Sequence, residues 1–230
     1  MYNLPQRLFA EFVGTFVVVL VGAGVICTDA FLRQQNQHPV GILGIALAQG
    51  LVYAVMVTSL HHVSGGHLNP AVTVGFWVTR KLSTLDTIAY AIVQLAGASL
   101  AAYVLSAMLA EAVWRPVGLG SPMLATDFTR MHGMLLEGLL TFVLVFVFFA
   151  TIADPNGATA RNMGLAVGFA VTVGALLGNP FTGACMNPAM AFGPALAAHH
   201  WTNQGTYWVG PLMGGILGAW VYSSAFMQRS

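Results

Sequence analysis

The sequence has 230 residues, of which 57% are hydrophobic and only 7% are charged, whereas soluble proteins average about 25% charged residues. No charged residue occurs in the 46 residues between Arg33 and Arg80, or in the 67 residues between Arg161 and Arg229. A net charge of +1 also lacks the basic excess that nucleic-acid binding needs. The composition therefore excludes a soluble enzyme, a disordered tail and a nucleic-acid binder, and predicts an integral membrane protein.

In chain order, apolar runs of about 20 residues, the length that crosses a bilayer, predict six transmembrane helices. Two shorter apolar stretches are about half a span each and have Asn-Pro near their starts. The first residues lack the charged start and cleavage site of a signal peptide, so we expect the first span to be retained. The expected elements are Leu8–Thr28, Val40–Leu60, Leu68–Val78 (short), Thr84–Leu109, Met131–Ala153, Asn162–Gly178, Met186–Ala197 (short) and Thr206–Met227.

The two halves of the chain repeat one another, as repeat one (about 7–110) and repeat two (about 131–228), joined by an outer loop over about 110–130. Each half has three spans and one short segment, and because three is odd, the second half enters the membrane inverted. We therefore expect one channel-like domain over 1–230, all-α, with six transmembrane helices, two re-entrant half-helices and an inverted 3+3 repeat. The matching motifs are Glu11-x3-Thr15 with Glu137-x3-Thr141, Asn69-Pro70-Ala71 with Asn187-Pro188-Ala189, and Gly97-x3-Ala101 with Gly214-x3-Gly218.

Basic residues between the spans indicate the orientation, because cytoplasmic loops carry an excess of Lys and Arg. The excess predicts that the N- and C-termini are both cytoplasmic, and we expect the cell (plasma) membrane as the location. The inner side then carries Arg7, Arg80, Lys81, Arg161 and Arg229, and the outer side carries Arg33, Arg115 and Arg130.

Each Asn-Pro-Ala predicts the start of a half-helix, because Asn caps a helix with its side-chain oxygen and Pro fits the first helical position. Capping leaves the amide NH₂ free to donate to a passing molecule. Each half-helix start also contributes about +0.5 of an elementary charge, which repels cations but not neutral solutes. The small residues before each cap predict backbone that lines a water-filled cavity, with carbonyl acceptors at Gly65, Gly66, His67, Gly183 and Cys185.

Other polar side chains in the apolar runs have competing interpretations. Glu11 and Glu137 are costly inside a membrane, which favours function; a proton relay is one interpretation, and we prefer hydrogen bonding to the backbone of the re-entrant loops. The histidines at 61, 62, 67, 199 and 200 have no acidic or thiol partner at ligand spacing, so we expect no metal site. Cys27 and Cys185 fit no redox or zinc motif and are expected to be unpaired. Glycines and alanines four residues apart predict close helix crossings.

These motifs resemble those of the aquaporins, the major intrinsic protein family, over essentially the whole chain. The resemblance rests on Ser64–Thr73, Thr182–Ala189, Phe192–Ala195 and the two Glu-x3-Thr openings. It implies a six-helix pore whose half-helices meet at the Asn-Pro-Ala pair, in a homotetramer with one pore per subunit, surrounded by membrane lipid. It also implies passive flux of water or small neutral solutes, without enzyme activity or a cofactor.

The family's narrowest point is a four-residue filter, which the resemblance places at Gln49, Ala175, Ala184 and Met190. Most family members have Arg at the position of Met190, and strict water channels typically have His at that of Ala175. The Asp that glycerol facilitators carry next is replaced by Ala191. These departures imply a wider, less polar constriction. The filter resembles that of plant tonoplast intrinsic proteins, which admit ammonia, urea or peroxide besides water.

Three alternatives stay open at this point. The missing filter Arg is compatible with an ion-conducting pore. An adhesion or structural membrane protein with a closed pore would have the same sequence features. Finally, the outer loop carries Arg115 and Arg130, and either guanidinium would replace the missing charge if the loop folded over the mouth of the pore.

Overall fold

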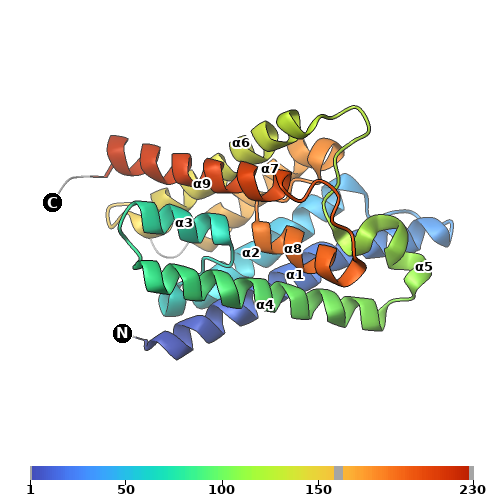
Figure 1. The fold of residues 1–230 in the computed structure, drawn as a ribbon, viewed down its shortest axis with the longest axis horizontal. Coiled ribbons are helices and arrows are strands. Elements are labelled where there is room, and N and C mark those ends of the chain that lie inside the picture. The colour runs from blue at the N-terminus through green and yellow to red at the C-terminus, as the bar shows by residue number, and fades with distance from the viewer. Residues whose placement is uncertain (1, 158–162, 228–230) are drawn as a thin grey trace.

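A computed structural model describes residues 2–157 and 163–227, and this part of the chain contains helices and no strands. Figure 1 shows the long helices running side by side along the longest axis of the molecule. The six long helices and two half-helices confirm the predicted fold class. The elements are α1 (Leu4–Gln34), α2 (Gly41–Ser64), α3 (Pro70–Val78), α4 (Thr84–Met108), α5 (Glu111–Trp114), the 3₁₀ segment η1 (Arg115–Gly120), α6 (Arg130–Phe148), the π-helical turn η2 (Phe149–Ala153), α7 (Met163–Thr182), α8 (Pro188–Ala198) and α9 (Thr206–Ala225).

Five of these helices, α1, α2, α4, α6 with its π-helical extension, and α7, are long and apolar enough to cross a membrane by length and composition. The sixth, α9, has 20 residues, which also spans about 30 Å of bilayer. It falls outside those five because glycine, tryptophan, tyrosine and serine, none of which is strongly hydrophobic, make up half of its residues. The composition of α9 thus reflects tight packing on a neighbouring helix more than contact with lipid.

The first helix is longer than the predicted span at both ends. It begins in a capping box, in which the Asn3 side chain accepts from the Gln6 backbone N–H and the Gln6 side chain accepts from that of Asn3. Its last turns continue past the apolar run because Asp29 and Arg33 form an ion pair of 2.7 Å between successive turns. The span prediction stopped where hydrophobicity stopped, whereas local polar contacts extend the helix beyond the membrane.

The predicted fifth span differs from α7 at its end. Its expected start, Asn162, lies outside the described residues, as do Arg161 and Arg229. The helix continues beyond the predicted end at Gly178 to Thr182, through Pro180. A proline this close to the end of a helix removes only one late hydrogen bond, so α7 continues to the re-entrant loop.

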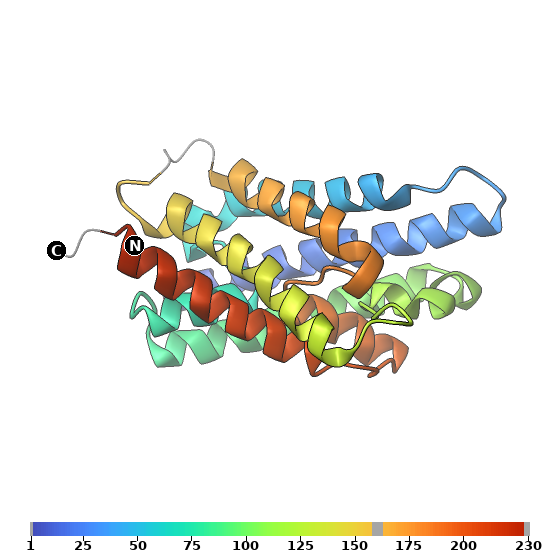
Figure 2. The same cartoon turned by 90° about the horizontal axis from the view of Figure 1, so that it is seen from above.

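The two repeats pack by exchanging their half-helices. In each repeat the first and third long helices pack together, as α1 with α4 and α6 with α9. Half-helix α3 of repeat one lies against α9 of repeat two, and α8 lies against α4. Figure 2 shows α2 and α7 side by side, the contact that joins the repeats through their second long helices. The packing therefore follows the internal repeat seen in the sequence.

Close helix crossings occur at the small residues that the sequence singled out. A Cβ atom at Gly97 would lie 2.4 Å from the carbonyl oxygen of Phe12, and one at Gly214 would lie 2.0 Å from that of Gly138. Both distances are far below a carbon–oxygen contact, so only glycine fits at these crossings. The predicted contacts at four-residue spacing are confirmed at these two positions.

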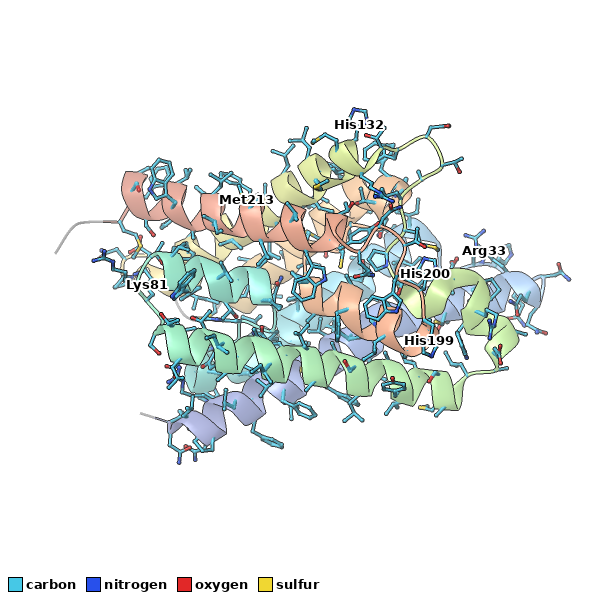
Figure 3. The ribbon with its side chains drawn as sticks, in the orientation of Figure 1. Arg33, Lys81, His132, His199, His200 and Met213 are labelled. Atoms are coloured by element: carbon cyan, nitrogen blue, oxygen red, sulfur yellow. The ribbon has the colours of Figure 1, made fainter. Side chains whose placement is uncertain are left out.

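The ends of the molecule carry different groups. Figure 1 shows the start of α1 and the end of α9 at the same end of the bundle. Figure 3 places Lys81 at that end, and Arg33, His199 and His200 towards the other. This arrangement separates Lys81 from Arg33, as the predicted orientation requires.

The α1–α4 crossing gives a stability test. Replacing Gly97 with Ala drives a methyl group into the backbone of α1, and such overpacking costs about 1–3 kcal/mol. The control is Gly24→Ala on the α1 side of the same helix pair, where an added Cβ would have only one near atom, in the Leu105 side chain at 3.4 Å. We expect Gly97→Ala to lower the thermal unfolding midpoint in detergent and Gly24→Ala to leave it unchanged. Equal midpoints for the two variants would contradict a close approach of α4 to α1 at Gly97.

Candidate functional site

The two Asn-Pro-Ala motifs cap the half-helices as predicted. Asn69 Oδ1 accepts from the Ala71 backbone N–H at 2.8 Å, and Asn187 Oδ1 accepts from that of Ala189 at 2.9 Å. Both asparagines are fully buried, and Pro occupies the first helical position of α3 and of α8. The two helix starts therefore lie inside the protein, each with its first turn satisfied by one side chain.

The amide groups of these asparagines tie the two repeats together. Asn69 Nδ2 donates to the Met186 carbonyl at 2.8 Å, and Asn187 Nδ2 donates to the Leu68 carbonyl at 3.0 Å. Each of these bonds uses one of the two hydrogens of its amide NH₂ group, a contact that the sequence did not indicate. Leu68 and Met186 have left-handed backbone angles, with φ of 52° and 51°, and this turn directs each carbonyl to the asparagine of the other repeat.

A tyrosine on α2 completes this centre. Tyr53 Oη lies 2.6 Å from Asn187 Nδ2, and its side chain is buried. Sequence reasoning missed this residue. The available signal was the single tyrosine of the second predicted span, at a position where the second repeat has Val171.

Glu11 holds the first re-entrant loop by four hydrogen bonds. One carboxylate oxygen accepts from Ser64 Oγ at 2.6 Å and from the His67 N–H at 3.0 Å. The other accepts from the Leu68 N–H at 2.7 Å and from Gln94 Nε2 at 2.9 Å. The carboxylate, which is fully buried, therefore serves the backbone of the loop.

Glu137 holds the second re-entrant loop in a similar way, by three hydrogen bonds. It accepts from Thr182 Oγ1 at 2.7 Å, from the Cys185 N–H at 3.0 Å and from the Met186 N–H at 2.7 Å. The loop positions match those of repeat one at the offset of 118 that relates Asn69 to Asn187, whereas the two carboxylates are 126 residues apart. Ser64, Thr182 and Gln94 were not predicted as partners of the carboxylates. No local sequence pattern shows which polar side chains a buried carboxylate reaches.

The carbonyl oxygens proposed as a ladder are free to accept. Among the described residues, no hydrogen bond ends on the carbonyl oxygens of Gly65, Gly66, His67, Gly183 or Cys185. The His67 ring packs against Phe76 and Tyr90, in agreement with a packing role. The Cys185 thiol donates to the Asn187 carbonyl at 3.0 Å, and both cysteines are unpaired as predicted.

A small cavity lies beside Tyr53. Its volume is about 10 Å³, close to the least space that holds one water molecule. Three of the four filter positions line it, and Ala175 does not. That alanine is fully buried in the apolar core, and Val171, one turn earlier on α7, reaches the cavity instead. The lining residues are Val18, Gly22, Gln49, Val52, Tyr53, Leu144, Val171, Ala184, Cys185, Met186 and Met190.

Gln49 and Met190 give this cavity its chemistry. The Gln49 amide is 3% exposed, and neither its nitrogen nor its oxygen has a partner among the described residues. Met190 packs over Gly22, where an added Cβ would lie 2.6 Å from the Met190 methyl group. Among the filter residues that line the cavity, Gln49 thus provides an amide that both donates and accepts hydrogen bonds, and Met190 provides an uncharged thioether.

Neither outer-loop arginine replaces the missing filter charge. Arg115 forms an ion pair with Glu111 and lies over the ring of Trp114. Arg130 donates to Asn203 Oδ1 at 2.8 Å. Neither lines the cavity beside Met190, so the described filter region has no arginine.

Comparison with known proteins finds the same family that the sequence motifs resemble. Residues 2–222 match the family described as Major intrinsic protein. The chain belongs to the major intrinsic protein family. Aquaporin TIP4-4 of Zea mays is 42% identical over 97% of this chain and 88% of its own length. Aquaporin-4 of Mus musculus is 40% identical over 96% of this chain and 67% of its own.

A solved structure supports the fold of this major intrinsic protein. The X-ray structure of the aquaglyceroporin from Plasmodium falciparum superposes with a TM-score of 0.78 and covers 97% of both chains, at 18% identity. Because identity is low, this match speaks for the fold alone. Family membership makes the protein an integral, multi-pass membrane channel and not an enzyme.

The loop carboxylates give a second stability test. Glu137→Ala leaves buried loop N–H groups without a partner, and each costs about 1–3 kcal/mol. We expect a strongly lowered unfolding midpoint in detergent, or loss of folded protein. Glu111→Ala removes an exposed carboxylate of a surface ion pair and should change the midpoint little. A Glu137→Ala protein as stable as Glu111→Ala would refute the bracing role.

Proposed function

We propose that this chain is a passive channel for water and small neutral solutes. The observation that carries the proposal is the pair of buried, capped half-helix starts bound to each other's loops, beside free carbonyl oxygens and an uncharged cavity. Such an arrangement offers hydrogen bonds to a neutral molecule along its path. The proposed pore residues are Asn69, Pro70, Ala71, Asn187, Pro188 and Ala189 at the centre, Gln49, Ala184 and Met190 in the filter with Ala175 behind it, the carbonyls of Gly65, Gly66, His67, Gly183 and Cys185, and the bracing carboxylates Glu11 and Glu137.

Electrostatics argues against the alternative of an ion pore. Each half-helix start carries about half a positive charge, which opposes cations at the narrowest region. Removing an ion from water into surroundings as apolar as this cavity costs tens of kcal/mol without compensating charges, and its lining residues carry no charge. The absence of an arginine therefore alters which neutral solutes pass, without creating an ion path.

The cavity chemistry defines the solute class. The Gln49 amide offers both a donor and an acceptor, which suits molecules that do both, such as water and ammonia, and also urea, glycerol or peroxide if the passage widens. Met190 presents a flexible, uncharged side chain in place of a fixed charge. We therefore propose water and ammonia as the principal solutes.

We further propose that the chain acts as one channel domain, that it assembles as a homotetramer with one pore per chain, and that both ends of the chain face the cytoplasm when it sits in the cell membrane. The assembly rests on family membership. The orientation rests on Lys81 lying at the same end as the start of α1 and the end of α9, because basic residues favour the cytoplasmic side.

Reconstituted vesicles test the channel. Purified protein in liposomes should accelerate osmotic shrinkage in a stopped-flow experiment, while planar bilayers with the same protein show no conductance. Shrinkage at the rate of empty liposomes would refute the channel. A conductance proportional to protein would favour the ion-pore alternative.

A substitution in the filter tests the solute class. Met190→Arg places a long cationic side chain beside the cavity and should reduce urea uptake more than water flux. Met190→Leu keeps an apolar side chain of similar size and is the control, expected to change both fluxes little. Equal loss of water and urea flux in Met190→Arg would show that Met190 does not discriminate between them.

A further inference from the structure

We infer that Tyr53 is a further specificity-determining residue of the pore, which occupies the amide of Asn187 and narrows the passage beside it. The inference deepens the proposed channel function and rests on it. The phenol oxygen lies 2.6 Å from Asn187 Nδ2, and the ring lines the same cavity as Gln49 and Met190. One side chain thus joins the filter cavity to the capped half-helix.

The two asparagines differ in their hydrogen bonds, although the repeat relates them. Within the described residues, Asn69 Nδ2 donates to one acceptor, the Met186 carbonyl. Asn187 Nδ2 donates to two, the Leu68 carbonyl and Tyr53 Oη. An amide NH₂ has only two hydrogens, so the tyrosine takes the one that a solute would otherwise bind. A solute therefore reaches Asn187 only by displacing the hydroxyl.

The internal repeat shows what Tyr53 adds. The residue at the offset of 118 that relates Asn69 to Asn187 is Val171, which lines the same cavity. A valine has neither a hydroxyl group nor a ring, so the first repeat contributes both bulk and a hydrogen-bonding group where the second contributes neither. With a cavity of about 10 Å³, the ring leaves space for about one water molecule.

Bulk and hydroxyl act on different solute properties. Exchanging the Tyr53–Asn187 hydrogen bond for a solute–Asn187 bond is nearly neutral for a good acceptor, so water and ammonia replace the hydroxyl readily. A larger solute such as urea must also move the ring, which packs among apolar side chains of the core. Tyr53 therefore selects for molecules that accept a hydrogen bond and are small.

Two substitutions separate these effects. Tyr53→Phe keeps the ring and frees Asn187, whereas Tyr53→Val copies the other repeat and removes the ring as well. Tyr103→Val is the matched control, because Tyr103 lies on α4 with half of its surface exposed and does not line the cavity. The full chain and each variant are reconstituted in liposomes, and stopped-flow light scattering measures water flux and urea uptake per protein.

We expect Tyr53→Phe to raise water flux about fivefold, the equivalent of one hydrogen bond of about 1 kcal/mol, without a rise in urea uptake. Tyr53→Val should raise water flux at least as much and also raise urea uptake above that of wild type, while Tyr103→Val leaves both unchanged. Gel filtration before reconstitution checks that each variant is folded. If Tyr53→Val does not fold, the nearly isosteric Tyr53→Phe still decides the role of the hydroxyl.

The outcomes separate this inference from the channel proposal. Water and urea fluxes equal to wild type in both Tyr53 variants, with wild type above empty liposomes, would overturn the role of Tyr53 and leave the channel function standing. Fluxes at the level of empty liposomes for wild type and every variant would overturn the channel function and the inference with it. A wild type above empty liposomes, with urea uptake raised by Tyr53→Val and not by Tyr53→Phe, would support both.

Discussion

The structure depends on how two stretches of non-helical backbone are satisfied at the depth of a membrane. Each re-entrant loop carries N–H groups that lipid cannot bond, and every unpaired group there costs several kcal/mol. Glu11 and Glu137 each accept the N–H groups of two consecutive loop residues and one hydroxyl group. A carboxylate suits this task because it only accepts, has two oxygens, and forms hydrogen bonds about twice as strong as those of neutral groups.

The N–H groups of each loop donate to its carboxylate, and the carbonyl groups of the loop point away from that carboxylate. Ser64 and Thr182 link loop and carboxylate at corresponding positions, and Tyr90 and Tyr207 donate to the carbonyls of these same two residues. Among the described residues, the carbonyls of Gly65, Gly66, His67, Gly183 and Cys185 accept no hydrogen bond. The polarity of the proposed path therefore originates in backbone groups, which explains how a channel can be polar inside with so few polar side chains.

Much of this arrangement was predictable from the sequence. Asn-Pro marks a helix start for reasons of local geometry, and the repeated Glu-x3-Thr and Asn-Pro-Ala implied inverted halves, so the half-helices and the carboxylate contacts followed. What could not be predicted depends on three-dimensional proximity. Nothing local shows that the Asn69 and Asn187 amides reach carbonyls of the opposite repeat, or that Tyr53 lies near Asn187. Likewise, counting residues placed Ala175 in the filter, but the packing of α7 buries Ala175 in the apolar core and brings Val171, one turn earlier, to the cavity.

The reciprocal bonds between the repeats have a consequence for biogenesis. The Asn69 amide binds the Met186 carbonyl, and α3 packs on α9, so the first re-entrant segment lacks both partners until the second half of the chain has been synthesised. Insertion of the first three spans therefore cannot complete the first loop. Each half-helix completes its contacts only when both halves are present, so the centre of the protein cannot be finished before the second half has been made.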